Sequence, residues 1–230
     1  MEPIPLEQNL NWWWYKAKSH LLRHILRNLR NTRYILEIGP GLGNNVKQLS
    51  SMGTLDLLET EENFIKHINN SHLKSLVNNI YTDLDEISLK YDLIIMLDVL
   101  EHIEESQKFM NKISNILEEN GSIVLGVPAY QSLWSVHDEK LKHFRRYNWK
   151  TIYTDCKSYE IVKRYGLNYL LLPIRYIQIK TNKVTTTNES GKIVSSILSL
   201  FVGAEAFLRK IGLNPKFGIS LYTVLKKKRN

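Results

Sequence analysis

The side chains best suited to chemistry in this sequence surround a run of three glycines. Gly39, Gly41 and Gly43 follow a short apolar stretch over residues 34–38, and Glu37 precedes the first glycine by two positions. Glycines let the backbone turn sharply and approach a ligand closely. A strand, a glycine loop and a helix in this order indicate a site for a nucleotide-like ligand at the end of the strand.

The spacing of these glycines distinguishes two classes of cofactor. A dinucleotide-binding loop has the pattern G-x-G-x-x-G, which would place the last glycine at position 44, where this chain has Asn44. The observed pattern is G-x-G-x-G. S-adenosylmethionine carries an ammonium and a sulfonium instead of a pyrophosphate, so a carboxylate such as Glu37 attracts it. The spacing therefore disfavours a nicotinamide oxidoreductase.

Further motifs follow this loop along the chain. The run Glu37-Ile38-Gly39-Pro40-Gly41-Leu42-Gly43 is followed by Glu59, by Thr82-Asp83-Leu84 and by Leu97-Asp98-Val99-Leu100-Glu101-His102. In these motifs, which extend from about Tyr34 to Val127, the sequence resembles the class I S-adenosylmethionine-dependent methyltransferases. The resemblance implies an enzyme (EC 2.1.1.-) that uses S-adenosylmethionine and releases S-adenosylhomocysteine.

The resemblance also implies a role for individual residues. The implied cofactor-binding residues are Glu37, Gly39, Gly41, Gly43, Glu59, Asp83, Leu84 and Asp98. Glu59 stands where the family binds the ribose hydroxyls, and Asp83 with its neighbour stands where the family contacts the adenine. Asp56 is an alternative for the ribose role. We prefer Glu59 because it ends the apolar run, at the rim where ligands of parallel sheets bind.

The elements that must position these residues alternate along the chain. Continuous apolar stretches, which predict strands, alternate with helical patterns from residue 34 to residue 127, and this favours a parallel sheet covered on both faces. With the resemblance, we expect an α/β fold: a Rossmann-like, doubly wound, mainly parallel seven-stranded sheet of the class I methyltransferase type. An N-terminal helix precedes it, and helical additions lie near the C-terminus.

We expect a single methyltransferase domain over residues 1–230. Residues 1–33 form an N-terminal helical cap, and residues 34–127 form the cofactor-binding core. Residues 128–218 form a substrate and cap region, in which residues 181–191 are polar and loop-like. Residues 219–230 provide the last strand and a basic tail.

The segment after the fifth strand has the densest set of candidate catalytic side chains. Methyl transfer to a hydroxyl requires alignment and removal of a proton, a task that suits histidine. We predict His137 and His143 as catalytic residues. The predicted substrate-binding residues are Tyr130, Trp134, Arg145, Arg146 and Tyr147. One alternative is a structural cap in which Arg146 is paired internally. Another is a metal site formed by His137, Asp138 and His143. The preferred assignment of catalytic and substrate-binding residues uses no metal.

The N-terminal aromatic run from Trp12 to Tyr15 has two interpretations. In the part of the family that this chain resembles, an aromatic pair before the first helix lies near the cofactor pocket, and here it would form a lid. The alternative is packing of the helix on the sheet, which we favour for Trp14. Lys16 and Lys18 stand where arginine is frequent.

Composition and charge limit the partners. The chain has 230 residues, 43% of them hydrophobic, one cysteine and a formal net charge of +8. It contains no apolar run long enough to span a bilayer, and we expect a cytoplasmic protein. The apolar stretches 170–179 and 192–211 could wall an acceptor site or touch a membrane peripherally. The sequence does not define an oligomeric state.

We therefore expect a methyltransferase for a small-molecule, glycan or lipid-linked acceptor, with oxygen as the methylated atom. The basic charge raises the alternative of an RNA or protein methyltransferase. Nucleic acid is disfavoured because Asp98 is not followed by the Pro-Pro-aromatic motif of base-amine methyltransferases, and no recognition module is visible. A further alternative is a binding protein that holds S-adenosylmethionine without catalysis.

Overall fold

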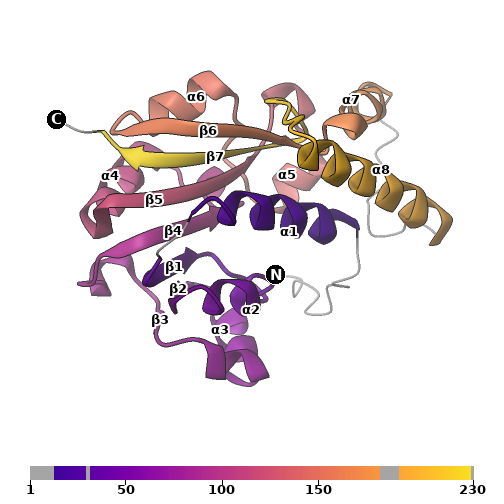
Figure 1. Ribbon diagram of the computed structural model, residues 1–230. Coiled ribbons are helices and arrows are strands. Elements are labelled where there is room, and N and C mark those ends of the chain that lie inside the picture. Colours follow the sequence, from indigo (N-terminus) through magenta and orange to yellow (C-terminus); the bar gives the residue numbers. More distant parts are fainter. Residues whose placement is uncertain (1–12, 30–31, 182–191, 229–230) are drawn as a thin grey trace.

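The computed structural model describes residues 13–29, 32–181 and 192–228. Its centre is a mixed sheet with the strand order β3-β2-β1-β4-β5-β7-β6 (Figure 1). The strands are β1 (Tyr34–Ile38), β2 (Thr54–Leu58), β3 (Ile80–Tyr81), β4 (Tyr91–Leu97), β5 (Leu117–Pro128), β6 (Tyr159–Leu167) and β7 (Ser220–Lys227). β1 to β5 are parallel, and β7 runs antiparallel between β5 and β6.

The helices cover both faces of this sheet. They are α1 (Trp13–Leu26), α2 (Val46–Ser50), α3 (Glu62–Asn69), α4 (Ser106–Ile116), α5 (Val136–Lys140), α6 (Trp149–Asp155), α7 (Leu172–Lys180) and α8 (Lys192–Lys210). Short 3₁₀ turns join them: η1 (His72–Leu76), η2 (Leu84–Glu86), η3 (Leu100–His102), η4 (Gln131–Leu133) and η5 (Tyr169–Leu171). α1 and α8 lie against each other in front of the sheet (Figure 1).

The sheet separates two buried hydrophobic cores, one on each face, because side chains alternate between the two faces along each strand. Ile35 of β1 belongs to the core that contains the inner side chains of α1 and α2. Leu36, the next residue, belongs to the core that contains Met110 of α4 and Ile152 of α6. The strands therefore have apolar residues on both faces, as the sequence predicts for a covered parallel sheet.

The chain order places a topological switch point at the end of β1. β1 pairs with β2 on one side and with β4 on the other. From β1, the strand order continues through β2 to β3 in one direction and through β4 to β5 in the other. Ile38 is in register with Leu58 and with Met96. Because ligands of open α/β sheets bind outside the carboxyl ends of strands at such a point, the loops after β1, β2 and β4 face one site.

The predicted fold class is confirmed, and several element boundaries are corrected. The sequence pattern after the glycine loop predicts a helix over residues 44–52, but α2 begins at Val46, whose N–H closes a turn onto the carbonyl of Gly43. The apolar pattern over residues 77–81 predicts a strand, but β3 is limited to Ile80–Tyr81. Residues 182–191, most of the predicted polar loop, and Trp12 lie outside the described residues. None of the helices in the described ranges is both long and apolar enough to cross a membrane.

Candidate cofactor and acceptor site

The glycine loop, residues 39–43, turns through a backbone conformation that favours glycine. Gly39, Gly41 and Gly43 have φ angles of +67°, +54° and +74°. A Cβ atom at Gly43 would lie 2.7 Å from Cδ1 of Leu73, whereas a Cβ atom at Gly41 would meet nothing within 4 Å. Gly43 is therefore needed for packing, and Gly41 faces open space at the end of β1.

Glu37 is a buried carboxylate with one free oxygen. It is 2% exposed, and its Oε1 accepts a 2.7 Å hydrogen bond from Nδ2 of Asn45. Its Oε2 has no hydrogen-bond partner among the described residues. Burial, and secondarily the nearby charge of Glu59, raise the pKa of Glu37 to about 7. A ligand cation would stabilise the ionised form.

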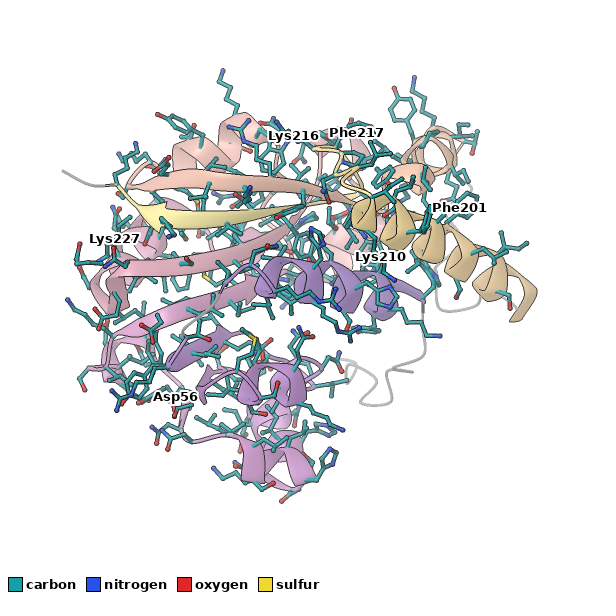
Figure 2. The ribbon with its side chains drawn as sticks, viewed as in Figure 1. Asp56, Phe201, Lys210, Lys216, Phe217 and Lys227 are labelled. Carbon is teal, nitrogen blue, oxygen red and sulfur yellow. The ribbon has the colours of Figure 1, made fainter. Side chains whose placement is uncertain are left out.

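Glu59 holds the glycine loop against the start of α3. Its Oε2 accepts a hydrogen bond from the N–H of Gly41 at 3.0 Å, and its Oε1 accepts from the N–H groups of Thr60 and Glu61. Asp56, the alternative residue, lies on β2 (Figure 2). Its carboxylate is already bound to Asn78, Asn79 and the hydroxyl of Tyr91. Each carboxylate thus accepts three hydrogen bonds, and Glu59 differs in lying directly after β2, in contact with the glycine loop.

Asp83 and Leu84 follow β3 at the same edge of the sheet. Asp83 is exposed, and its Oδ1 accepts the N–H of Asp85 at 2.8 Å, which caps η2. Leu84 is partly buried and packs against the core. The loop after β3 thus presents a carboxylate and an apolar side chain together. The carboxylate suits the polar edge of an adenine ring, and the apolar side chain suits its face.

Asp98 connects the end of β4 with the N-terminal helix. It has a φ of +56°, uncommon for a residue other than glycine, and its N–H bonds the carbonyl of Gly126. Its carboxylate forms an ion pair with Lys18 of α1, and the Lys18 ammonium also lies 5.3 Å from the centre of the Trp14 ring. The charge of Asp98, after burial itself, raises the pKa of Tyr15 to about 12. α1 therefore covers the end of β4 with Trp14, Tyr15 and Lys18.

A second buried carboxylate, Glu101, lies one turn beyond Asp98. It is 0% exposed, and neither of its carboxylate oxygens has a hydrogen-bond partner among the described residues. Burial and the charge of Asp98 raise its pKa well above the usual range. His102 and His143 lie beside it, with ring centres 4.6 Å apart in an edge-to-face arrangement. We call Glu101, His102 and His143 the β4-end cluster.

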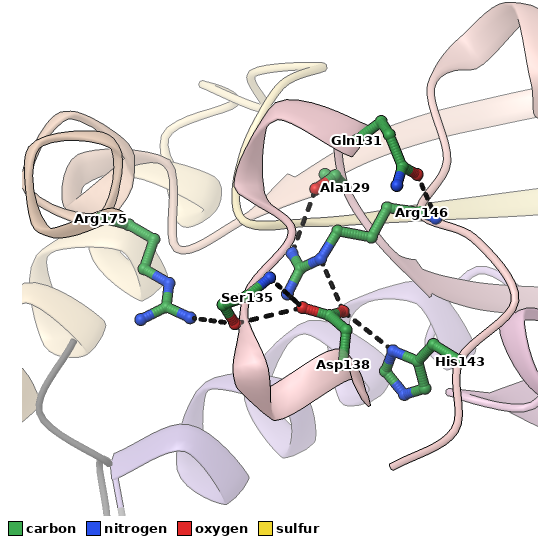
Figure 3. Close-up of polar contacts among 7 residues, drawn as sticks. All are labelled: Ala129, Gln131, Ser135, Asp138, His143, Arg146 and Arg175. Carbon is green, nitrogen blue, oxygen red and sulfur yellow. Dashed lines mark hydrogen bonds and ion pairs between the residues drawn. The ribbon is translucent and has the colours of Figure 1, made fainter. Parts of the chain in front are cut away.

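Asp138 organises the segment that follows β5 (Figure 3). Arg146 binds both of its oxygens, at 2.7 and 2.9 Å, and Nδ1 of His143 lies 2.9 Å from Oδ1. The N–H of Ser135 donates to Oδ2 at 2.9 Å, and Arg175 of α7 reaches Oγ of Ser135 at 3.3 Å. The partners hold the pKa of Asp138 below its usual range against the opposing effect of burial. His143 is thus fixed in orientation by a charged neighbour.

The predicted substrate-binding residues divide into two groups. Arg146 is buried and also donates to the carbonyl of Ala129, and Tyr147 is fully buried with its hydroxyl 3.3 Å from the carbonyl of Leu100. Arg145 donates to the carbonyl of Glu104 and to Oγ of Ser106. These contacts support the structural-cap alternative for the three residues. Tyr130 and Trp134 stay partly exposed, and Tyr130 has a φ of +55°.

His137, the other predicted catalytic residue, lies on the exposed side of α5. Desolvation lowers its pKa below the usual value. Among the described residues, its ring makes no aromatic contact with the β4-end cluster. The sequence predicted His143 but missed Glu101 and the groups that the fold gathers near Glu101 and Asp98. These are Lys18 and the buried Tyr222 hydroxyl, which has no hydrogen-bond partner within the described residues. The only sequence signal was the adjacency of Glu101 and His102 to Asp98.

Two cavities lie away from the glycine loop. The larger, about 410 Å³, is lined by Asn28, Thr32, Asp92, Asn120 and Lys226, among others, near the amino ends of β1 and β4. We do not assign it to the cofactor because ligands of such sheets bind at the carboxyl ends. The smaller, about 200 Å³, lies between α1 and α8.

The sheet order, the switch point and the glycine loop with its acidic neighbours define the Rossmann-like fold of the class I S-adenosylmethionine-dependent methyltransferases. Comparison with family models agrees, since the methyltransferase domain model matches residues 10–171, well over half of the chain. The chain belongs to this methyltransferase domain family. No curated protein sequence matches it.

Solved structures show the same fold. NodS, an N-methyltransferase from Bradyrhizobium japonicum in complex with S-adenosylhomocysteine, matches with a TM-score of 0.59 and 14% identity over 99% of this chain and 90% of its own. A methyltransferase from Clostridium acetobutylicum has a TM-score of 0.59 and 13% identity, over 94% of this chain and 92% of its own. Phosphoethanolamine N-methyltransferase 2 from Haemonchus contortus, in complex with S-adenosylmethionine, has a TM-score of 0.60 and 14% identity over 94% of this chain, which spans 53% of it.

Proposed function

We propose that this methyltransferase transfers a methyl group from S-adenosylmethionine to a hydroxyl oxygen of a small, lipid-linked acceptor. The cofactor would lie over the glycine loop, with its ammonium at Glu37, its ribose at Glu59 and its adenine between Asp83 and Leu84. The free oxygen of Glu37 supports this placement because a buried, unpaired carboxylate favours a cationic ligand. The sulfonium would then face Asp98 at the end of β4.

The observation that favours oxygen is the β4-end cluster. A hydroxyl must lose its proton as the methyl group is transferred, and a positioned base accelerates that step. His143, oriented by Asp138, and His102 lie at the carboxyl end of β4, on the acceptor side of the expected sulfonium. Desolvation by the groups packed around part of its ring, and the neighbouring His143, lower the pKa of His102, which favours the neutral form that can accept a proton.

Nitrogen is the second candidate for the methylated atom. The structures from Bradyrhizobium japonicum and Haemonchus contortus are N-methyltransferases by name. An amine that is neutral when bound needs no base before it attacks the methyl group. Loss of the two histidines should therefore affect hydroxyl and amine acceptors differently.

The lipid-linked character is inferred from the surface of α8. Ile197, Leu200, Phe207 and Ile211 are 49%, 73%, 62% and 58% exposed. Their spacing places Ile197, Leu200 and Phe207 along one face of α8, and Ile211 follows directly after its end. Phe201 and Lys210 mark the course of α8 in Figure 2. A continuous exposed apolar stripe is typical of a surface that contacts another apolar phase.

The cavity between α1 and α8 adds positive charge on the side of α8 that faces α1. Four of its seven lining residues are arginines or lysines, namely Arg23, Arg27, Arg209 and Lys210. Arg209 is paired with Glu205, whereas Arg23, Arg27 and Lys210 are exposed. Arginines and lysines beside an apolar stripe are the combination that binds the headgroups of an anionic membrane. We infer peripheral contact with such a membrane.

The function is tested with methyl-labelled S-adenosylmethionine and matched pairs of hydroxyl and amine acceptors, free and coupled to a lipid. We expect transfer to lipid-linked hydroxyls and a loss of about 100-fold in kcat for His143→Ala with them. Transfer to amines only would establish the second candidate. Transfer only to RNA, with a steep salt dependence, would contradict the proposal.

A further inference from the structure

The β4-end cluster brings three potential metal ligands together from two distant segments. Glu101 and His102 follow β4, and His143 lies in the turn after α5. One ligand atom from each residue lies within 4.8 Å of the ligand atoms of the other two. The N–H of Phe144 donates to the carbonyl of Glu101 at 2.8 Å, which ties the two segments together next to the cluster.

Glu101 is a buried carboxyl group for which the described side chains supply no cation. An ionised carboxylate is costly at this fully buried position unless a cation pairs with it. The charged side chains whose positive potential reaches it are Lys18 and Arg146. Lys18 is bound to Asp98, and Arg146 is bound to Asp138. Both cations are therefore already engaged by other carboxylates.

The orientation of His143 is that of a metal-binding histidine. Its Nδ1 lies 2.9 Å from the carboxylate of Asp138, which implies that Nδ1 carries the proton. Nε2 is then a free acceptor. Histidines that bind metals almost always donate their other N–H to a carboxylate or carbonyl, which fixes the ring and makes the ligand nitrogen more basic. Asp138 is itself held by Arg146 and Ser135, so the whole support is rigid.

We propose that Glu101, His102 and His143 bind one divalent transition-metal ion, with Zn²⁺ as the best fit. Two imidazoles and one carboxylate are a frequent ligand set for a catalytic zinc ion, which keeps a further position open. Ligand atoms around such an ion lie about 3.4 Å apart for bonds of about 2.1 Å. His102 is exposed, so its ring can rotate to close the remaining gap.

A metal ion here would serve the acceptor side of the enzyme. The open position would take an acceptor hydroxyl, whose oxygen becomes easier to deprotonate when it is bound to zinc. In the metal-bound enzyme, His102 and His143 would act as ligands, and this activation would replace their direct role as bases. The metal site itself does not depend on which acceptor is used, because its argument rests on the three ligands and on Asp138. It also differs from the combination of His137, Asp138 and His143 that the sequence suggests, since Asp138 faces Arg146 and His143 as a supporting group.

Titration of the metal-free protein with Co²⁺ tests the site through the visible absorption that four-coordinate Co²⁺ acquires. We expect one Co²⁺ per chain, displaced by Zn²⁺ and not by Mg²⁺. Glu101→Gln and His102→Ala should each weaken binding by at least tenfold. His72→Ala, which removes an exposed histidine on η1, should leave binding unchanged.

Two outcomes would overturn the proposal. One is a wild-type protein that binds neither Co²⁺ nor Zn²⁺; the other is binding that Glu101→Gln leaves unaltered. Thermal unfolding of each variant without metal distinguishes a lost ligand from a lost fold. Glu101→Gln is expected to melt at or above the wild-type temperature, since it removes a buried charge and keeps the shape of the side chain. If metal binds while hydroxyl methylation fails, only the proposed function is contradicted.

Discussion

Nδ2 of Asn45 donates a 2.7 Å hydrogen bond to Oε1 of Glu37, and this bond joins the end of β1 to the N-cap residue of α2. It leaves the second carboxylate oxygen of Glu37 buried and without a partner in the described part of the chain. The glycine loop is therefore closed around a carboxyl group whose ionisation is costly in the free protein.

This relationship predicts that binding of S-adenosylhomocysteine depends on pH. The pKa of Glu37 is raised to about 7, so below that pH the free protein must release a proton before the carboxylate can pair with the ligand ammonium. The affinity should rise about tenfold between about pH 6 and about pH 8, with proton uptake by the buffer, as measured by calorimetry in two buffers. Glu37→Gln should bind more weakly and show a flat profile.

The same shift has the opposite effect on the stability of the free protein. A carboxyl group whose folded-state pKa is raised stabilises the fold most below its unfolded pKa of 4.5, and this contribution is lost as pH rises through about 7. Glu37→Gln should therefore remove part of the fall in the free energy of unfolding over that window. An unchanged pH dependence of both binding and unfolding would show that Glu37 ionises normally.

Gly43 and Gly41 form a matched pair for the glycine loop. Both have positive φ, which costs an alanine about 1–2 kcal/mol. A Cβ atom at Gly43 also meets Leu73 at 2.7 Å and Val46 at 3.2 Å, so Gly43→Ala should lower the free energy of unfolding by about 2–4 kcal/mol.

Gly41→Ala should cost only about 1 kcal/mol in stability. It should nevertheless weaken S-adenosylhomocysteine binding more than tenfold, because the added methyl group enters the open space at the end of β1. Urea unfolding and calorimetry measure the two effects separately. Equal losses of stability in the two variants would contradict the difference in packing.

The sequence predicted the elements that carry local signals. The apolar runs over residues 34–38 and 91–97 predict two strands, and they coincide with β1 and β4 because each run becomes buried on both faces of the sheet. The preference for Glu59 over Asp56 also rests on a local feature, its place after the last apolar residue of β2. That choice stays a prediction, because Asp56 and Glu59 each accept three hydrogen bonds.

The contacts of the acceptor side were not predictable, because they join segments far apart in the chain. Lys18 and Asp98 are 80 residues apart, and Glu101 and His143 come from different connections of the sheet. Without the topology, Glu101 resembles any acidic residue at a helix start. Its complete burial is what marks Glu101 as a candidate functional residue. That burial depends on how α1 and the segment around His143 close over β4.

Asp138 is predicted to be the polar residue on which the cap depends most. Asp138→Asn leaves the buried Arg146 guanidinium without a counter-charge, and breaking a buried ion pair in this way costs about 3–5 kcal/mol. Denaturant unfolding should show a loss of that size. Glu139→Gln, an exposed neighbour on α5, should change the free energy of unfolding by less than about 0.5 kcal/mol. A similar small effect for Asp138→Asn would mean that Arg146 is solvated in solution.

The apolar stripe of α8 provides the last prediction. Leu200→Ser and Phe207→Ser change side chains that are 73% and 62% exposed, so they should alter the free energy of unfolding by less than about 0.5 kcal/mol. If the stripe enters a membrane, each should reduce co-sedimentation with anionic vesicles several-fold, because each removes apolar area that would leave water. Arg23→Ala should reduce binding to anionic vesicles and make the remaining binding less sensitive to salt.

Val136→Ser, which changes a side chain 62% exposed on α5, is the control for a general loss of surface hydrophobicity. Vesicle binding that Val136→Ser lowers as much as Leu200→Ser, or that is equal on neutral and anionic vesicles, would contradict a membrane site formed by α8 and the basic cavity beside it.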